Sequence, residues 1–164
     1  MKLRQGLLLI GGGAIAFGLI KYFQQQKQLL EAIGYKVVKV QFAESSFQNV
    51  KLLITLKLTN NSDISFTIGG YTLNVFVNEE PVSRVVNVKF DEKVSGFGQS
   101  KDIEFYADFS PQQLLQGNVI TDILTSGNIG NTDIAVKGVF TIKKYGFKLS
   151  DYPVDIALKL EDFV

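Results

Sequence analysis

The most regular alternation in the chain is Val50-Lys51-Leu52-Leu53-Ile54-Thr55-Leu56-Lys57-Leu58-Thr59. In an extended chain, the even-numbered residues of this stretch share one face and are all apolar. The odd-numbered residues face the other way, and most of them are Lys or Thr. Alternation with a period of two residues is typical of a strand that has one buried face. This stretch therefore predicts a β-sheet protein.

The same alternation recurs along the chain. We expect seven strands, at residues 37–42, 50–59, 71–77, 86–90, 102–109, 134–142 and 154–160. Residues 78–81 have the chemistry of a turn. One helix interrupts the series, with Ser110 as its N-cap, Pro111 as its first residue and Gly127 as its end. Because each strand keeps one polar face, the sequence predicts an all-β, seven-stranded antiparallel β-sandwich with one inserted helix.

The N-terminal segment has a different character. Gln5 to Ile20 carries no charge, and it lies between Arg4 and Lys21. We favour an uncleaved transmembrane helix, because a span needs roughly 20 residues and terminal cations can reach the two interfaces. A signal peptide cleaved near residues 14–16, or a buried helix of a soluble protein, are the alternatives. The membrane-anchor residues are expected to be Leu7, Leu8, Leu9, Ile10, Ile15, Phe17, Leu19 and Ile20.

Small residues within this segment are spaced four apart. They permit close helix–helix packing, or they are merely small; the residues are Gly12, Ala14, Ala16 and Gly18. The helix is expected to continue to Ile33 and to stop at Gly34, with its outer part forming a stalk. Its apolar residues Tyr22, Leu29, Leu30 and Ile33 would pack on the domain or on a partner. The sequence thus predicts two parts, a transmembrane helix and stalk at 1–34 and a sandwich at 35–164.

Composition limits the chemistry. The chain has 164 residues, 46% of them hydrophobic and 20% charged, with a formal net charge of +1, no Cys and no His. Disulfides, thiolate or imidazole metal sites and His-based nucleophilic catalysis are therefore excluded. We expect no catalytic residues, no cofactor, no metal and no small-molecule ligand. The near-neutral charge also argues against a nucleic-acid partner.

Two groups of side chains are candidates for contact with a partner. Lys143, Lys144 and Lys148 form a basic cluster that would touch lipid headgroups or another protein, or would be a solvated hairpin. A second group forms either an exposed sticky face or part of the core: Phe47, Phe66, Phe76, Phe97 and Tyr106.

Several motifs together resemble a known family. They are the long strand that ends in Asn60-Asn61-Ser62, the turn at 78–81, the helix that follows the fifth strand, and the segment Lys137–Ile142 followed by Tyr145-Gly146 and Tyr152-Pro153-Val154. From about residue 35 to 160, the chain resembles the late-embryogenesis-abundant (LEA) type 2 family, also called the water-stress and hypersensitive-response (WHy) domain. The family usually has Asn-Pro-Asn where this chain has Asn60-Asn61-Ser62.

The resemblance implies a sandwich similar to immunoglobulin and fibronectin III domains, often preceded by a membrane segment, and it implies no catalytic residues. Our prediction is a non-catalytic, single-pass membrane protein with an N-terminal anchor. Its sandwich would be a structural or interaction module, with the lipid bilayer and other protein subunits as partners. The assembly would be a cell-envelope complex or the virion of a membrane-containing phage. The alternative is a module that binds or transfers lipid or another apolar ligand at a membrane.

Overall fold

The computed structural model describes residues 21, 24, 27–46, 48–110 and 132–163. In this part of the chain, residues 27–31 are helical and eight strands follow them. The chain then ends in a 3-10 turn, η3 (Leu160–Phe163). The strands are β1 (Ile33–Ser45), β2 (Val50–Asn60), β3 (Phe66–Val77), β4 (Glu80–Asn87), β5 (Glu92–Val94), β6 (Gln99–Phe109), β7 (Asp133–Lys144) and β8 (Phe147–Lys159).

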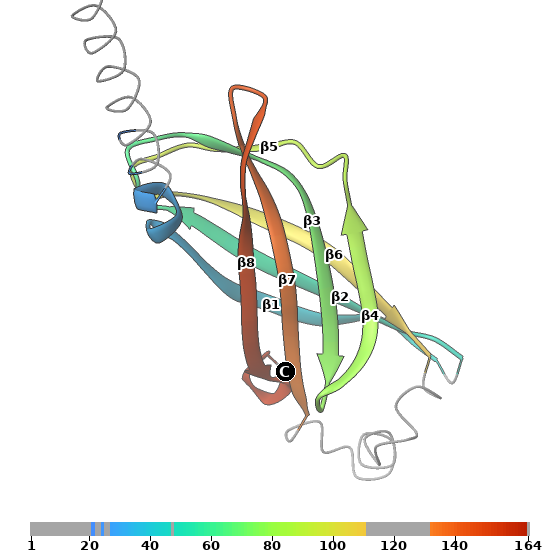
Figure 1. Ribbon diagram of the computed structural model, residues 1–164. Helices are drawn as coiled ribbons and strands as arrows, with labels where there is room; N and C mark the ends of the chain where they lie inside the picture. Colours follow the sequence, from blue (N-terminus) through green and yellow to red (C-terminus); the bar gives the residue numbers. More distant parts are fainter. Residues whose placement is uncertain (1–20, 22–23, 25–26, 47, 111–131, 164) are drawn as a thin grey trace, which may run out of the picture.

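The strands form two antiparallel sheets. The smaller sheet has the order β1-β2-β6, and the larger has the order β4-β3-β7-β8 with β5 also paired to β3. In Figure 1 the strands of the smaller sheet run across those of the larger one. The all-β, antiparallel architecture predicted from the alternation is therefore confirmed.

The core lies between the two sheets. The even-numbered residues of β2 face it, and Ile54, Leu56 and Leu58 are fully buried. Their partners in β6 are Phe105, Ile103 and Lys101. Other fully buried side chains come from the larger sheet: Ile68, Leu73, Val75, Ile134, Phe140 and Ile142. Burial of these apolar faces is the main stabilising contribution to the fold.

Two tyrosines join the sheets where β1 and β8 lie next to each other. The Tyr35 hydroxyl accepts a hydrogen bond from the backbone N–H of Asp155 (3.1 Å) and donates one to its carbonyl oxygen (3.3 Å). The Tyr152 hydroxyl donates to the carbonyl oxygen of Ile33 (2.9 Å). Burial, and secondarily the nearby Tyr35, raises the pKa of Tyr152. These side chains satisfy backbone groups that an edge strand otherwise leaves open to another chain.

The helical residues before β1 are packed onto the sandwich. Leu29 and Ile33 are 3% and 5% exposed and belong to the core, and Leu30 packs against it. The stalk residues within the described part of the chain therefore contact the domain, as one of the two sequence alternatives predicted. The helix ends at Glu31 rather than at Ile33, because β1 already begins at Ile33, which pairs with Asn60.

The strand boundaries differ from the prediction in several places: β1, β3 and β8 begin at residues 33, 66 and 147 rather than at 37, 71 and 154. The described residues form eight strands rather than seven, because β5 has only three residues and is too short to show a period. The strand after the turn is β4, at 80–87 rather than 86–90. A bulge at Val82 reverses its alternation, so Val85 packs against the core while Val86 is 52% exposed.

Candidate interaction surfaces

One end of the sandwich carries the start of β1 and several loops, and we call this end the helix pole. It comprises residues 27–32, 61–65, 88–91, 95–98 and 144–147. The backbone N–H of Asn61 donates to the carbonyl oxygen of Ala32 (3.0 Å), and that of Phe97 donates to the carbonyl oxygen of Ser62 (2.7 Å). Thr67, at the start of β3, pairs with Lys93 on one side and Lys143 on the other. In Figure 1 the β7–β8 hairpin projects at the top, opposite the β3–β4 turn.

The helix pole is organised by one buried amide, that of Asn60, which is 0% exposed. Its Nδ2 donates to the carbonyl oxygens of Ile64 (2.8 Å) and Val94 (3.4 Å). Its Oδ1 accepts from the backbone N–H (3.1 Å) and the hydroxyl (2.6 Å) of Ser62. All four hydrogen-bonding positions of the amide are thereby used, which fixes the 61–65 loop against the end of β5.

The predicted basic cluster lies on the β7–β8 hairpin. Lys143 and Lys148 are direct partners across the hairpin, and Lys144 lies over the Tyr145 ring at 5.2 Å. Lys148 pairs with Asp151 at 2.8 Å. This hydrogen bond lowers the pKa of Asp151. The structure thus brings the three lysines together, and their contact with a partner stays a prediction.

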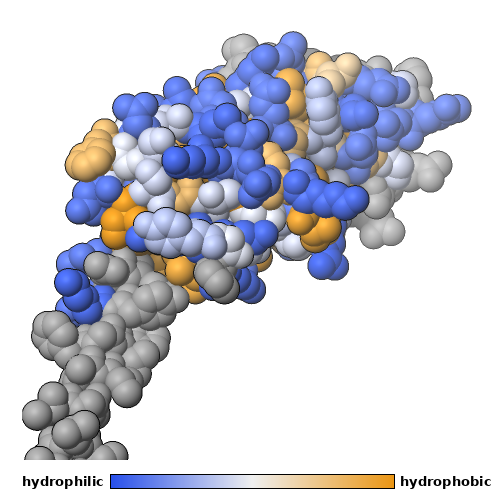
Figure 2. Space-filling model, turned by 90° about the horizontal axis from the view of Figure 1, so that it is seen from above, coloured by the Kyte–Doolittle hydropathy of each residue, from blue (hydrophilic) through white to orange (hydrophobic). Residues whose placement is uncertain are grey.

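The predicted aromatic face does not form as one surface. Phe66 is buried at 2% exposure, whereas Phe97 is 81% exposed. Phe47 lies outside the described residues. Sequence reasoning missed Tyr145 and Val88, which are 87% and 76% exposed. Figure 2 looks onto this end of the molecule and shows a mostly hydrophilic surface with separate hydrophobic side chains in it.

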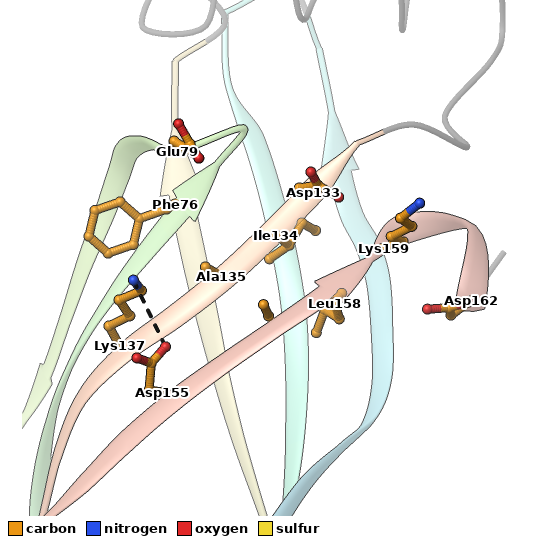
Figure 3. Close-up of a pocket in the computed structure, with 11 residues that line it drawn as sticks. Phe76, Glu79, Asp133, Ile134, Ala135, Lys137, Asp155, Leu158, Lys159 and Asp162 are labelled. Carbon is orange, nitrogen blue, oxygen red and sulfur yellow. Dashed lines mark ion pairs between the residues drawn. The ribbon is translucent and has the colours of Figure 1, made fainter.

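A shallow groove of about 800 Å³ lies on the outer face of the larger sheet, toward the opposite end (Figure 3). Its floor is the cross-strand pair Ala135 and Ala157, whose small side chains leave a depression between larger neighbours. Lys137 and Asp155 form an ion pair (3.9 Å) on one side of the alanines, and the Asp133–Lys159 strand pair lies on the other. Four acidic side chains and two lysines line the groove, so its charge is net negative and disfavours an anionic ligand.

Several predicted sites fall outside the described residues. They are the anchor residues Leu7 to Ile20, the small residues Gly12, Ala14, Ala16 and Gly18, and the helix expected from Pro111 to Gly127. Within the described residues, no helix is both long enough and apolar enough to cross a membrane. In the same part of the chain, no three acidic side chains converge in a way that could hold a metal ion.

Comparisons with known proteins give a fold and no closer relation. No protein-family model matches the chain, and no curated protein matches it. The solution structure of AT1g01470 from Arabidopsis thaliana aligns with a TM-score of 0.51 over 77% of this chain and 80% of that one, at 12% identity. Similar structures also include a candidate LEA protein, At2g46140.1, with a TM-score of 0.49 over 99% and 94% of the two chains at 14% identity.

A crystal structure of a protein from Archaeoglobus fulgidus aligns with a TM-score of 0.49 over 77% of this chain and 97% of that one, also at 14% identity. At 12% identity, the alignment with AT1g01470 shows a shared fold and nothing closer.

Proposed function

We propose that this chain is a non-catalytic, single-pass membrane protein that presents its sandwich to a larger assembly of a cell envelope or virion membrane. The observation that carries the proposal is the joint between the helical residues 27–31 and the sandwich. Leu29 and Ile33 are buried in the same core as β2 and β7. A membrane-spanning segment that precedes this joint would therefore hold the domain in a fixed orientation at the bilayer.

The second candidate, an apolar ligand carried between the sheets, would need a continuous cavity there. That space is instead occupied by Leu52, Leu56, Phe105 and Phe140, each 2% exposed or less. Side chains packed at interior density leave no room for an acyl chain unless the sheets separate. We therefore place the interaction role first.

We also propose that the chain is a divergent member of the LEA type 2 family. The support is the set of motifs from Asn60 to Val154, together with the fold shared with the Arabidopsis protein. The buried amide of Asn60 gives the first of these motifs a physical role, since it holds the loop after the long strand.

Alkaline carbonate extraction of membranes that contain the full chain tests the anchor. We expect the native chain to stay in the membrane pellet and the Ile10→Lys/Ile15→Lys variant to be released. Each charge placed at the centre of a span costs about 2.5–3.5 kcal/mol. The control is Gln24→Lys/Gln28→Lys, which adds the same charge at exposed positions beyond the predicted span. Release of the native chain would refute the anchor.

Cross-linking in the native membrane, followed by purification in mild detergent, tests the assembly. We expect cross-links between described residues of the sandwich and other protein subunits. A chain recovered without any cross-linked protein would contradict the assembly role while leaving the anchor unaffected.

A further inference from the structure

Two turns at the helix pole have the same unusual construction. In each, an aromatic residue with a positive φ is followed by a glycine with a positive φ: Phe97 (60°) and Gly98 (78°), and Tyr145 (51°) and Gly146 (80°). Asn, Asp and Gly are the residues that such turns favour, because a bulky side chain is strained at a positive φ.

Burial of the side chain does not offset this backbone strain at either position. Phe97 and Tyr145 are 81% and 87% exposed, and Val88 at the same pole is 76% exposed. These are the three most exposed large hydrophobic side chains among the described residues. The turn at the opposite pole differs, since Asn78 and Glu79 occupy its positive-φ positions and Asn78 Oδ1 accepts from the N–H of Asp133 (2.8 Å).

Several lysines lie in or next to the helix pole. Within the described residues, Lys89, Lys93, Lys143 and Lys144 make no ion pair, while Lys148 is held by Asp151. Asp63 and Asp91 are the unpaired acids of the same pole, so the basic excess is small. Aromatic and valine side chains, rather than charge, therefore dominate what this surface can bind. Figure 2 shows that hydrophobic side chains on this side of the molecule are scattered among hydrophilic ones.

The N-terminal sequence indicates that the helix pole faces a membrane. The charge-free stretch from residue 5 to residue 20 precedes, by six residues, the helical residues 27–31 that join the sandwich here. Isolated aromatic side chains flanked by lysines suit the boundary between headgroups and acyl chains, where an aromatic ring is half solvated and a lysine reaches phosphate. A protein partner would favour a continuous apolar patch instead.

We propose that Phe97 and Tyr145, supported by Val88, dip into the interfacial layer of the bilayer that holds the chain. This inference rests on the proposed membrane anchor and adds a second, peripheral contact to it. The two turns and the N-terminal segment would fix the domain at three points, so the sandwich would stand in a defined orientation on the membrane.

The chain contains no Trp, so a single Trp can report its own surroundings. The full chain is reconstituted in phosphatidylcholine vesicles, with and without phosphatidylserine and with lipids brominated in their acyl chains. The Phe97→Trp and Tyr145→Trp variants should show blue-shifted emission that the brominated lipid quenches, in both lipid mixtures. The control Glu80→Trp, exposed at the opposite pole, should keep water-like emission without quenching.

The outcomes separate this inference from the anchor. Vesicles that carry the chain on flotation but quench none of the three variants would overturn the inference and leave the anchor standing. A chain that does not float with vesicles would overturn both. A blue shift that depends on protein concentration and not on brominated lipid would assign the turns to contact between copies, which also overturns the inference.

A stability measurement excludes a purely structural role for the aromatic residues. The Phe97→Asn/Tyr145→Asn variant places at both turns a residue that tolerates a positive φ. Its Tm should equal or exceed that of the native chain. A marked loss of Tm would show that the rings support the fold, and would overturn the inference.

Discussion

Replacing Asn60 by Ala tests whether one buried amide holds the helix pole together. The substitution removes two hydrogen bonds donated by Nδ2 and two accepted by Oδ1, at 2.8, 3.4, 3.1 and 2.6 Å. A net contribution of about 0.5–1.5 kcal/mol for each of the four bonds gives an expected loss of about 2–6 kcal/mol. Against a typical total stability of about 5–15 kcal/mol, such a loss is large.

The measurement is thermal and urea unfolding of the full chain in mild detergent, monitored by far-ultraviolet circular dichroism. At about 2–4 °C per kcal/mol, a loss of this size should lower Tm by roughly 4–24 °C in a chain of this length. The matched control is Asn61→Ala, because Asn61 is exposed and its backbone N–H, which bonds Ala32, is retained. We expect the control to change stability by no more than about 0.5 kcal/mol.

Asn60→Asp sharpens the test. This variant keeps the acceptor oxygen but loses both donors and buries a carboxylate, so burial should raise the pKa of the new carboxyl. The variant should therefore be least stable at neutral pH and should recover as the pH falls through the raised pKa. If Asn60→Ala is no more destabilising than Asn61→Ala, or if Asn60→Asp shows no recovery in acid, the amide does not carry this part of the fold.

Two further predictions concern backbone contact and pH. Gly138→Ala should cost about 3 kcal/mol in urea unfolding, because a Cβ there would overlap the Thr72 carbonyl oxygen and lie 2.9 Å from Leu73 Cα; an unchanged midpoint contradicts it. Because the pKa of Tyr152 is raised in the folded state, the neutral hydroxyl stabilises the fold. This contribution to stability is complete below the usual pKa of 10.0 and is lost as the pH rises through the raised pKa of the folded protein. Tyr152→Phe should cost about 1 kcal/mol at neutral pH by losing the bond to Ile33, and should flatten the alkaline loss of stability; equal alkaline titrations of both proteins would refute this.

The strands with one fully buried face could be predicted from the sequence. β2, β6 and β7 alternate over eleven or twelve residues, and their inward residues include Ile54, Ile103 and Val136, all 0% exposed. β5 was missed because three residues carry no period. β4 was misplaced because the bulge at Val82 exchanges its two faces, and no local signal marks a bulge whose cause is its pairing with β3.

The candidate surface was only partly predictable, for a different reason. The lysines of the 143–148 hairpin stand out in sequence, since a cluster of charge needs no tertiary information to be seen. The identity of an aromatic residue in a β protein does not indicate whether it is buried. Phe66 and Phe97 are both phenylalanines, but they are 2% and 81% exposed. The distinguishing signal was Phe97-Gly98, matched by Tyr145-Gly146, where a following glycine marks a turn rather than a strand.

The residue at position 61 connects the buried amide to the orientation of the domain. In the family that the sequence resembles, proline usually occupies this position, and proline has no N–H to donate. Here the N–H of Asn61 bonds the carbonyl oxygen of Ala32, while the N–H of Ala32 lies 3.1 Å from the carbonyl oxygen of Gln28. The last helical turn, the loop fixed by Asn60 and the turn that carries Phe97 are therefore linked by consecutive hydrogen bonds. Because these bonds are consecutive, the direction of the helix sets the direction of the turn that carries Phe97, and Asn61→Pro should loosen the helix and this turn together.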